Sequence, residues 1–122
     1  MIITYYGHSC FEVEIKGRHL LFDPFIRPNE LARNIQVNNI KADYILISHG
    51  HEDHIADAVE IAKRTGAKVI CNWEIFVWLS KQGVENIHPM NIGGKTRLDF
   101  GNVKCVAAAH SSSLPDGSNG GN

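Results

Sequence analysis

The chain has 122 residues, of which 43% are hydrophobic and 20% charged, as is typical of one soluble globular domain. Its formal net charge is -1 and it has no basic run, which argues against nucleic-acid binding. No apolar run could span a membrane, and the N-terminus lacks a signal-peptide pattern. Three widely spaced cysteines, Cys10, Cys71 and Cys105, favour reduced thiols over a disulfide framework, so we expect a cytoplasmic protein.

The first part of the chain predicts antiparallel strands over residues 2–6, 10–15 and 19–22. In the second of these strands, Phe11, Val13 and Ile15 alternate with charged residues, which predicts one apolar and one solvated face. Asp23 and Pro24 end the meander because proline cannot continue a central strand. A polar, asparagine-containing loop is then expected over residues 25–41, with a short helical turn over 31–35.

The middle of the chain alternates strand and helix patterns, which indicates an α/β fold. A buried strand over 43–48 leads to a helix that begins at Asp53 as N-cap and ends at Gly66, and Gly83 closes a second helix. The expected elements after the first of these helices are a strand over 67–71, a helix over 73–82, and strands over 87–92, 97–100 and 103–109. Residues 1–110 thus form the predicted domain, and the Ser/Gly/Asn-rich residues 111–122 a flexible tail.

A dense group of metal-binding side chains directly follows the strand over 43–48. His49, His51, Asp53 and His54 fall within six consecutive residues, and imidazole and carboxylate are ligands of zinc, iron and manganese. His49 and His51 are two residues apart, so both rings can reach one metal, whereas Asp53 and His54 point to a neighbouring volume. This spacing suits two adjacent cations that share a hydroxide nucleophile.

Three residues outside the cluster are further candidates for the site. His110 follows an apolar stretch and would supply a third imidazole to the first metal, which is a common catalytic zinc arrangement. Asp23 could accept a hydrogen bond from a ligand imidazole or simply cap a turn. His8 lies at a strand end, either lining the pocket or as an ordinary strand-end residue.

The motif His49-x-His51-x-Asp53-His54 resembles the signature of the metallo-β-lactamase superfamily. The stretches Gly7-His8-Ser9-Cys10-Phe11 and Leu21-Phe22-Asp23-Pro24 are similar to a branch of metal-dependent hydrolases related to ascorbate-6-phosphate lactonase. The resemblance implies the N-terminal half of an αββα sandwich, a mixed sheet with helices on one face. It also implies that His49, His51 and His110 bind one metal and Asp53 and His54 another.

By the same resemblance, Asp53 would also be catalytic, by orienting the hydroxide or protonating the leaving group. Zinc is the expected metal, although manganese and iron accept the same ligands. The family's second half normally supplies a bridging aspartate and a last histidine, neither of which follows His110 here. We therefore expect an inner sheet face that a missing C-terminal half or a homo-oligomeric partner would cover.

Three functions remain open from the sequence. The first is a binuclear hydrolase, present as an incomplete half, that acts on an ester, lactone or phosphoester in a small-molecule substrate. The second is a non-catalytic metal-binding or assembly module that pairs with another chain. The third is an iron-dependent oxidoreductase of the same superfamily.

Overall fold

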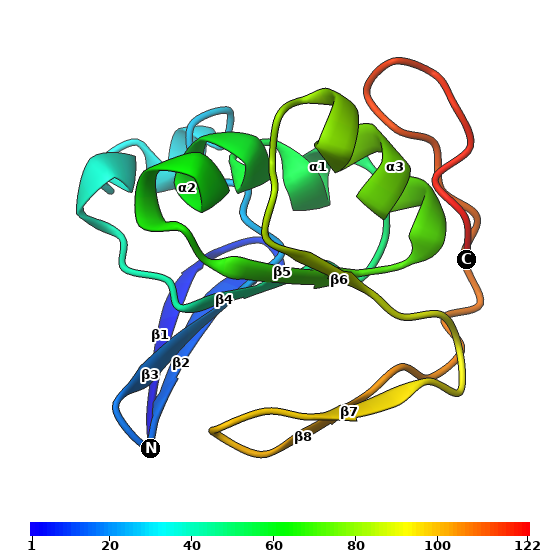
Figure 1. Cartoon of the computed structure of the whole chain (residues 1–122). Helices are drawn as coiled ribbons and strands as arrows, with labels where there is room; N and C mark the ends of the chain where they lie inside the picture. Colours follow the sequence, from blue (N-terminus) through cyan, green and yellow to red (C-terminus); the bar gives the residue numbers. More distant parts are fainter.

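A six-stranded mixed sheet forms the centre of the structure, a computed structural model that describes residues 1–122. The strands lie side by side in chain order, β1 to β3 antiparallel and β3 to β6 parallel (Figure 1). Their bounds are β1 Ile2–Gly7, β2 Cys10–Ile15, β3 Arg18–Phe22, β4 Tyr44–Leu46, β5 Lys68–Cys71 and β6 Ile87–Pro89. The predicted α/β class and mixed sheet are confirmed.

The helices all cover one face of this sheet, as expected (Figure 1). They are α1 Glu52–Ile55, α2 Ala58–Thr65 and α3 Trp73–Lys81, preceded by 3₁₀ turns at Glu30–Ala32 and Val37–Asn39. The turns occupy the loop for which one turn over 31–35 was predicted. None of the helices is long and apolar enough to cross a membrane.

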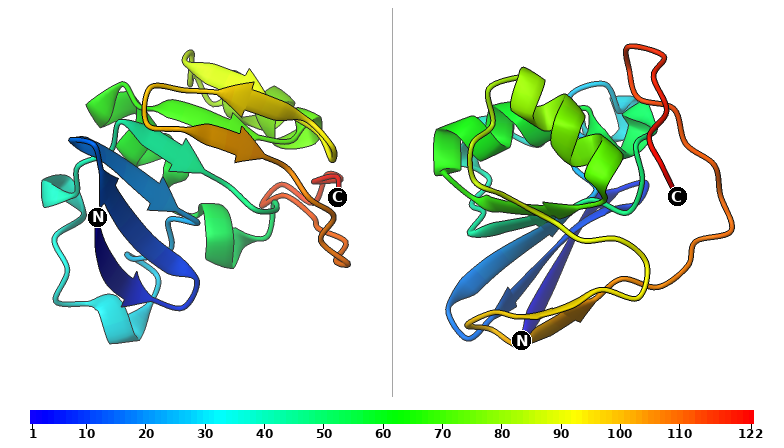
Figure 2. Two further views of the ribbon diagram at one scale, coloured as in Figure 1. Left: turned by 90° about the horizontal axis from the view of Figure 1, so that it is seen from below. Right: turned by 45° about the vertical axis from the view of Figure 1, so that its right-hand side comes forward.

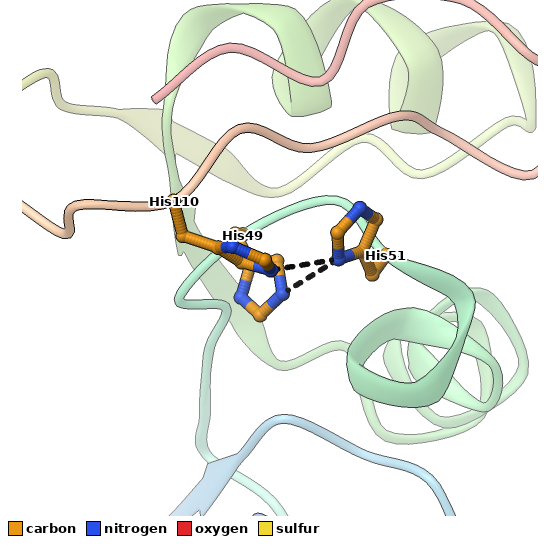
Figure 3. Close-up of side chains that lie close together, drawn as sticks. All are labelled: His49, His51 and His110. Carbon is orange, nitrogen blue, oxygen red and sulfur yellow. Dashed lines mark hydrogen bonds between the residues drawn. The ribbon is translucent and has the colours of Figure 1, made fainter.

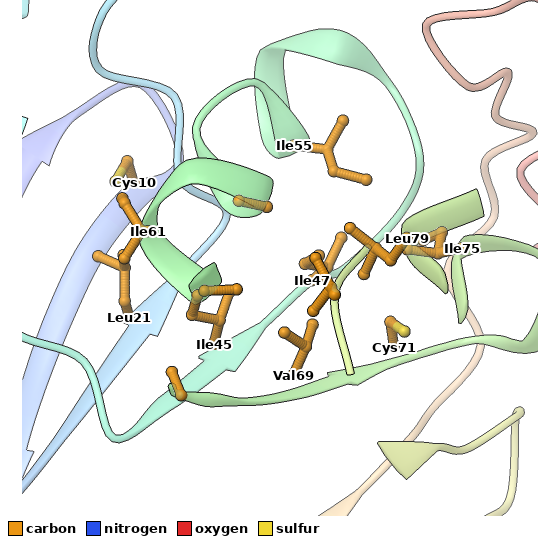
Figure 4. Packing of buried hydrophobic residues seen from close by; sticks show 14 of the residues in the cluster. Cys10, Leu21, Ile45, Ile47, Ile55, Ile61, Val69, Cys71, Ile75 and Leu79 are labelled. Carbon is orange, nitrogen blue, oxygen red and sulfur yellow. The ribbon is translucent and has the colours of Figure 1, made fainter. Parts of the chain in front are cut away.

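Branched aliphatic side chains fill the space between the sheet and the helices (Figure 4). Ile45 and Val69 from the central strands face Ile61 of α2 and Leu79 of α3, and all four are fully buried. Burial of a side chain of this size stabilises the fold by roughly 1.5–3 kcal/mol. The apolar run of the sequence therefore becomes the layer that supports the histidine loop.

The helix ends agree with the sequence at their C-termini and differ at one N-terminus. Gly66 adopts φ +71° and its N–H donates to the carbonyl of Ala62, as predicted for a C-cap. Asp53, predicted as an N-cap, lies inside α1, which His51 precedes. The carboxylate of Asp53 pairs with Nε2 of His8 instead of capping a helix. The single helix predicted over this stretch is divided, and α2 begins after Asp57, whose buried carboxylate accepts hydrogen bonds from the backbone of residues 26 and 27.

The prediction of a solvated charged face on β2 is wrong. Glu12 is only 9% exposed, because it lies beside the loop over residues 35–41 and accepts hydrogen bonds from the hydroxyl of Tyr6 and from Nδ1 of His19. On the opposite face, the ring of Phe11 stacks on that of Phe22 at 4.5 Å. Buried charge is tolerated here since both carboxylate oxygens have partners.

A separate hairpin partly covers the face opposite the helices (Figure 1). It consists of β7 Lys95–Arg97 and β8 Asn102–Lys104. The strand predicted over 97–100 is wrong, since only Arg97 of it lies in β7, and β8 is shorter than the strand predicted over 103–109. Residues 98–101 form the turn, in which Asp99 accepts a hydrogen bond from Tyr44 and Phe100 packs on its ring. Beyond the hairpin this face stays open, and Ile3 and Tyr5 are 63% and 69% exposed.

The last residues, 111–122, for which the composition predicts a flexible tail, lie against the rest of the domain. They fold back along the end of α3, as two views show (Figure 2). Leu114 is 4% exposed and belongs to the main hydrophobic cluster, and the side chain of Asn72 donates a hydrogen bond to the carbonyl of Gly120. One buried leucine and these hydrogen bonds hold the segment against the domain, although its sequence has no extended apolar pattern.

Candidate metal centre

The candidate residues gather where three strands end on the same edge of the sheet. Strands β1, β3 and β4 run in one direction, since β2 is antiparallel to both β1 and β3, and β4 is parallel to β3. Their C-terminal ends are followed directly by His8, by Asp23 and by the segment 48–54. The C-terminal edge of parallel strands is the usual place for a ligand site in α/β sheets.

Three imidazoles converge in the first group (Figure 3). Nδ1 of His51 lies 3.2 Å from Nε2 of His49 and 3.1 Å from Nε2 of His110. Ring nitrogens bound at 2.0–2.1 Å to a tetrahedral zinc are roughly 3.3 Å apart. The three histidines, from segments about 60 residues apart in the chain, are therefore spaced as one metal would require.

A second group lies beside the first and combines Asp53 and His54 with His8. One ligand atom from each residue lies within 4.8 Å of those of the other two. Nε2 of His8 donates a hydrogen bond to Oδ2 of Asp53 at 2.9 Å, and Nε2 of His54 is 3.8 Å from the same oxygen. The rings of His49 and His54 are only 4.0 Å apart, so the two groups adjoin.

The carboxylate of Asp23 links β3 to both groups. It is 7% exposed and accepts hydrogen bonds from the backbone N–H of Ser48 at 2.7 Å, from its hydroxyl at 2.6 Å and from Nδ1 of His54 at 2.9 Å. A carboxylate that holds one ring nitrogen of a histidine fixes its tautomer and leaves the other nitrogen to a metal. In His54, Nδ1 is held in this way, which leaves Nε2 as the nitrogen that could bind a metal.

Ser48 extends the same arrangement to His49. Its single hydroxyl proton goes to Asp23, so its oxygen accepts from Nδ1 of His49 at 3.0 Å. Nε2 of His49 thereby carries a lone pair directed at the other two histidines. Burial, followed by the electrostatic effect of the neighbouring His54, lowers the pKa of His49, which favours the neutral form that binds a metal.

Asp53 is held as a carboxylate in the second group. Its partial burial raises the pKa, but the hydrogen bond from His8 and the charge of His54 outweigh burial and bring the pKa below its usual value. An ionised Asp53 offers a second oxygen besides the one that His8 contacts. Side chains of both groups, among them Asp53, His8 and His110, are exposed, so the site opens to solvent.

The structure brings together every residue that the sequence singled out for the site. Metal ligation by His49, His51, Asp53, His54 and His110 stays a prediction, but the donor set fits divalent metals because it consists of imidazole nitrogens and a carboxylate. Two serines with direct contacts to the site, at positions 48 and 112, were missed, since a single serine carries no motif.

The comparisons with known proteins agree with this geometry. A family model described as the metallo-beta-lactamase superfamily matches residues 3–105. A UPF0173 metal-dependent hydrolase of Methylacidiphilum infernorum is 58% identical over 121 residues, which is 99% of this chain and 54% of that protein. The UPF0173 metal-dependent hydrolase YtkL of Bacillus subtilis is 46% identical over 119 residues, 98% of this chain and 52% of that protein.

Among solved structures, the metallo hydrolase Igni18 from Ignicoccus hospitalis matches with a TM-score of 0.76 and 36% identity, over 97% of this chain and 52% of that one. The chain thus spans about half the length of the relatives that it matches. The family model covers most of the chain, including the histidine cluster. The chain therefore belongs to the metallo-β-lactamase superfamily.

Proposed function

We propose that this chain carries the metal-binding part of a binuclear metal-dependent hydrolase. The observation that carries the proposal is the convergence of three ring nitrogens: Nδ1 of His51 lies 3.2 Å from Nε2 of His49 and 3.1 Å from Nε2 of His110, and all three atoms lie within 4.8 Å of one another. Asp53 and His54 would hold the second ion, because their group adjoins the first. Zinc suits this donor set best, and manganese and iron are alternatives.

The chemistry would be hydrolysis of an ester, lactone or phosphoester. Divalent metals bound in the two groups would lower the pKa of water and polarise the carbonyl or phosphoryl oxygen of the substrate. Asp23 fixes the tautomers of His54 and, through Ser48, of His49, so that Nε2 of each ring is available. Asp53, which accepts a hydrogen bond from His8, would orient the hydroxide or protonate the leaving group.

The open face of the sheet supports the proposal that a further protein segment covers it in the active enzyme. Ile3 and Tyr5 are exposed beside the stacked rings of Phe11 and Phe22, on the face that no helix covers. The relatives are about twice as long as this chain. Hydrolysis is therefore proposed for the protein at the length of its relatives, and residues 1–122 alone should turn over poorly.

Metal analysis of three variants tests the proposal. After equilibration with Zn²⁺ and removal of free metal, His51→Ala should lose most of the metal that the unaltered chain retains, since one lost ligand weakens a three-histidine site severely. His88→Ala is the matched control, because His88 lies in β6 and belongs to neither group. Asp53→Asn should lower the stoichiometry by about one ion, the one assigned to the second group.

Two results would contradict the proposal. Equal metal content in the unaltered chain and in His51→Ala would rule out metal binding by the three histidines. Robust turnover of bis(p-nitrophenyl) phosphate by residues 1–122 that a chelator leaves unchanged would remove the metal from the chemistry.

A further inference from the structure

The segment that carries His110 has little structure of its own. Strand β8 ends at Lys104, and residues 106–111 are all exposed, with Val106 at 73%. The only backbone hydrogen bond within residues 106–111 runs from the N–H of His110 to the carbonyl of Ala108. Nothing within this stretch explains why the ring of His110 meets His49 and His51.

The nearest fixed point is Ser112, two residues beyond His110. Its side chain is buried, and its hydroxyl oxygen accepts a hydrogen bond at 3.1 Å from the N–H of Gly50, the residue between His49 and His51. The same hydroxyl donates to the carbonyl of Gly121 at 3.1 Å. One side chain thus connects the two segments that supply the three imidazoles.

The two segments touch so closely that glycine is required on both sides. A Cβ added to Gly50 would lie 2.9 Å from Cδ2 of Leu114 and 3.3 Å from Oγ of Ser112. A Cβ on Gly120 would lie 2.5 Å from the same Oγ. The backbone of Gly120 is fixed in turn, because its N–H donates to the carbonyl of Ser112 and its carbonyl accepts from the side chain of Asn72, the N-cap of α3.

We propose that Ser112 is a positioning residue that holds His110 against His49 and His51 and so preorganises the three-histidine site. The inference rests on the proposed metal site. The N–H of Gly50 is a buried donor whose partner is this hydroxyl, so removal of the hydroxyl leaves the N–H without an acceptor. It also removes the contact that holds residues 106–111 in place. A metal must then order His110 itself, and binding weakens by that cost.

Ser112→Ala in the 122-residue chain tests the role, with Ser111→Ala and Ser113→Ala as matched controls. Both control serines are exposed neighbours on the same segment. Co²⁺ titration followed by visible absorption reports the three-histidine site directly, and amide exchange of residues 106–110 in the metal-free protein reports the order of the segment. We expect roughly 10–100-fold weaker Co²⁺ binding and faster exchange in Ser112→Ala only.

Ser112→Thr, which retains an Oγ, should restore Co²⁺ affinity to within about threefold, and it keeps the test decisive if the alanine variant folds poorly. Unchanged affinity and unchanged exchange in Ser112→Ala would overturn the positioning role while leaving the metal site intact. Absence of Co²⁺ binding by the unaltered chain would instead refute the proposed metal site and this inference with it.

Discussion

Replacement of Asp23 by asparagine gives the sharpest prediction on how the fold supports the site. The carboxylate accepts three hydrogen bonds, one on Oδ1 from the N–H of Ser48 and two on Oδ2 from the hydroxyl of Ser48 and from Nδ1 of His54. Asparagine offers one acceptor oxygen and an NH₂ group. If the amide oxygen takes the place of Oδ2, the NH₂ group faces the partly buried N–H of Ser48, and two donors are opposed.

The expected loss of stability follows from these bonds. An unsatisfied donor costs about 1–3 kcal/mol when buried, and the N–H of Ser48 is only partly buried, so the low end of this range, about 1 kcal/mol, applies. The two remaining hydrogen bonds lose the charge of their acceptor, which weakens each by about 1 kcal/mol. We therefore expect Asp23→Asn to lower the free energy of unfolding of the metal-free chain by about 2–3 kcal/mol, a substantial share of the roughly 5–15 kcal/mol typical of a domain.

Urea unfolding of the metal-free protein, followed by circular dichroism, measures this change, and zinc binding provides the second readout. Zinc affinity should fall roughly 10–100-fold, because the tautomers of His54 and His49 are no longer fixed. Asp99→Asn is the control, an exposed aspartate in the β7–β8 turn that should leave the unfolding midpoint nearly unchanged. A loss below about 1 kcal/mol in Asp23→Asn, with unchanged zinc affinity, would refute the reasoning.

Two further predictions concern other parts of the chain. His8→Ala removes the hydrogen bond to Asp53, so the zinc affinity of the second group should fall several-fold while that of the three-histidine site is unaffected. Calorimetry would show this as a change in one of two separate titration phases. Equal loss of affinity at both sites would contradict the assignment of His8 to the second group. Burial raises the pKa of Cys10 to about 11 and of Cys71 to about 12, so at pH 8 a disulfide reagent should label Cys105 alone in the folded chain and all three cysteines in guanidinium. Fast labelling of all three cysteines without denaturant would contradict the burial of Cys10 and Cys71.

The parts of the fold that could be predicted are those that local patterns determine. The bounds of β2 match the sequence prediction, and α3 begins at Trp73 as its apolar spacing indicates. The burial of Glu12 could not be predicted, because alternation separates two faces of a strand without telling which one another layer covers. Coverage of Glu12 depends on the loop over residues 35–41, which is distant in sequence and has no strand or helix pattern of its own.

In the site, too, local patterns predict the residues that are adjacent in sequence but not the contacts between distant segments. His49, His51, Asp53 and His54 are adjacent in sequence, so their spacing alone predicted a cluster, and only the structure shows that His110 reaches it. Composition predicted disorder over 111–122 because Ser, Gly and Asn lack apolar bulk. In the structure the same small residues permit close backbone contact with Gly50, a use that composition does not reveal.

The backbone at the strand ends shows how firmly the fold determines this geometry. His8 and Asp23 adopt φ +53° and +43°, in the left-handed region that non-glycine residues rarely occupy. Each such residue costs on the order of 1–3 kcal/mol unless its surroundings hold it. Both directly follow a strand of the sheet, and both direct a side chain to the histidine cluster. The unusual backbone at these two positions thus lies in the turns that direct the two side chains to the site, and the register of β1 against β2 shifts between Tyr5 and Gly7, just before His8.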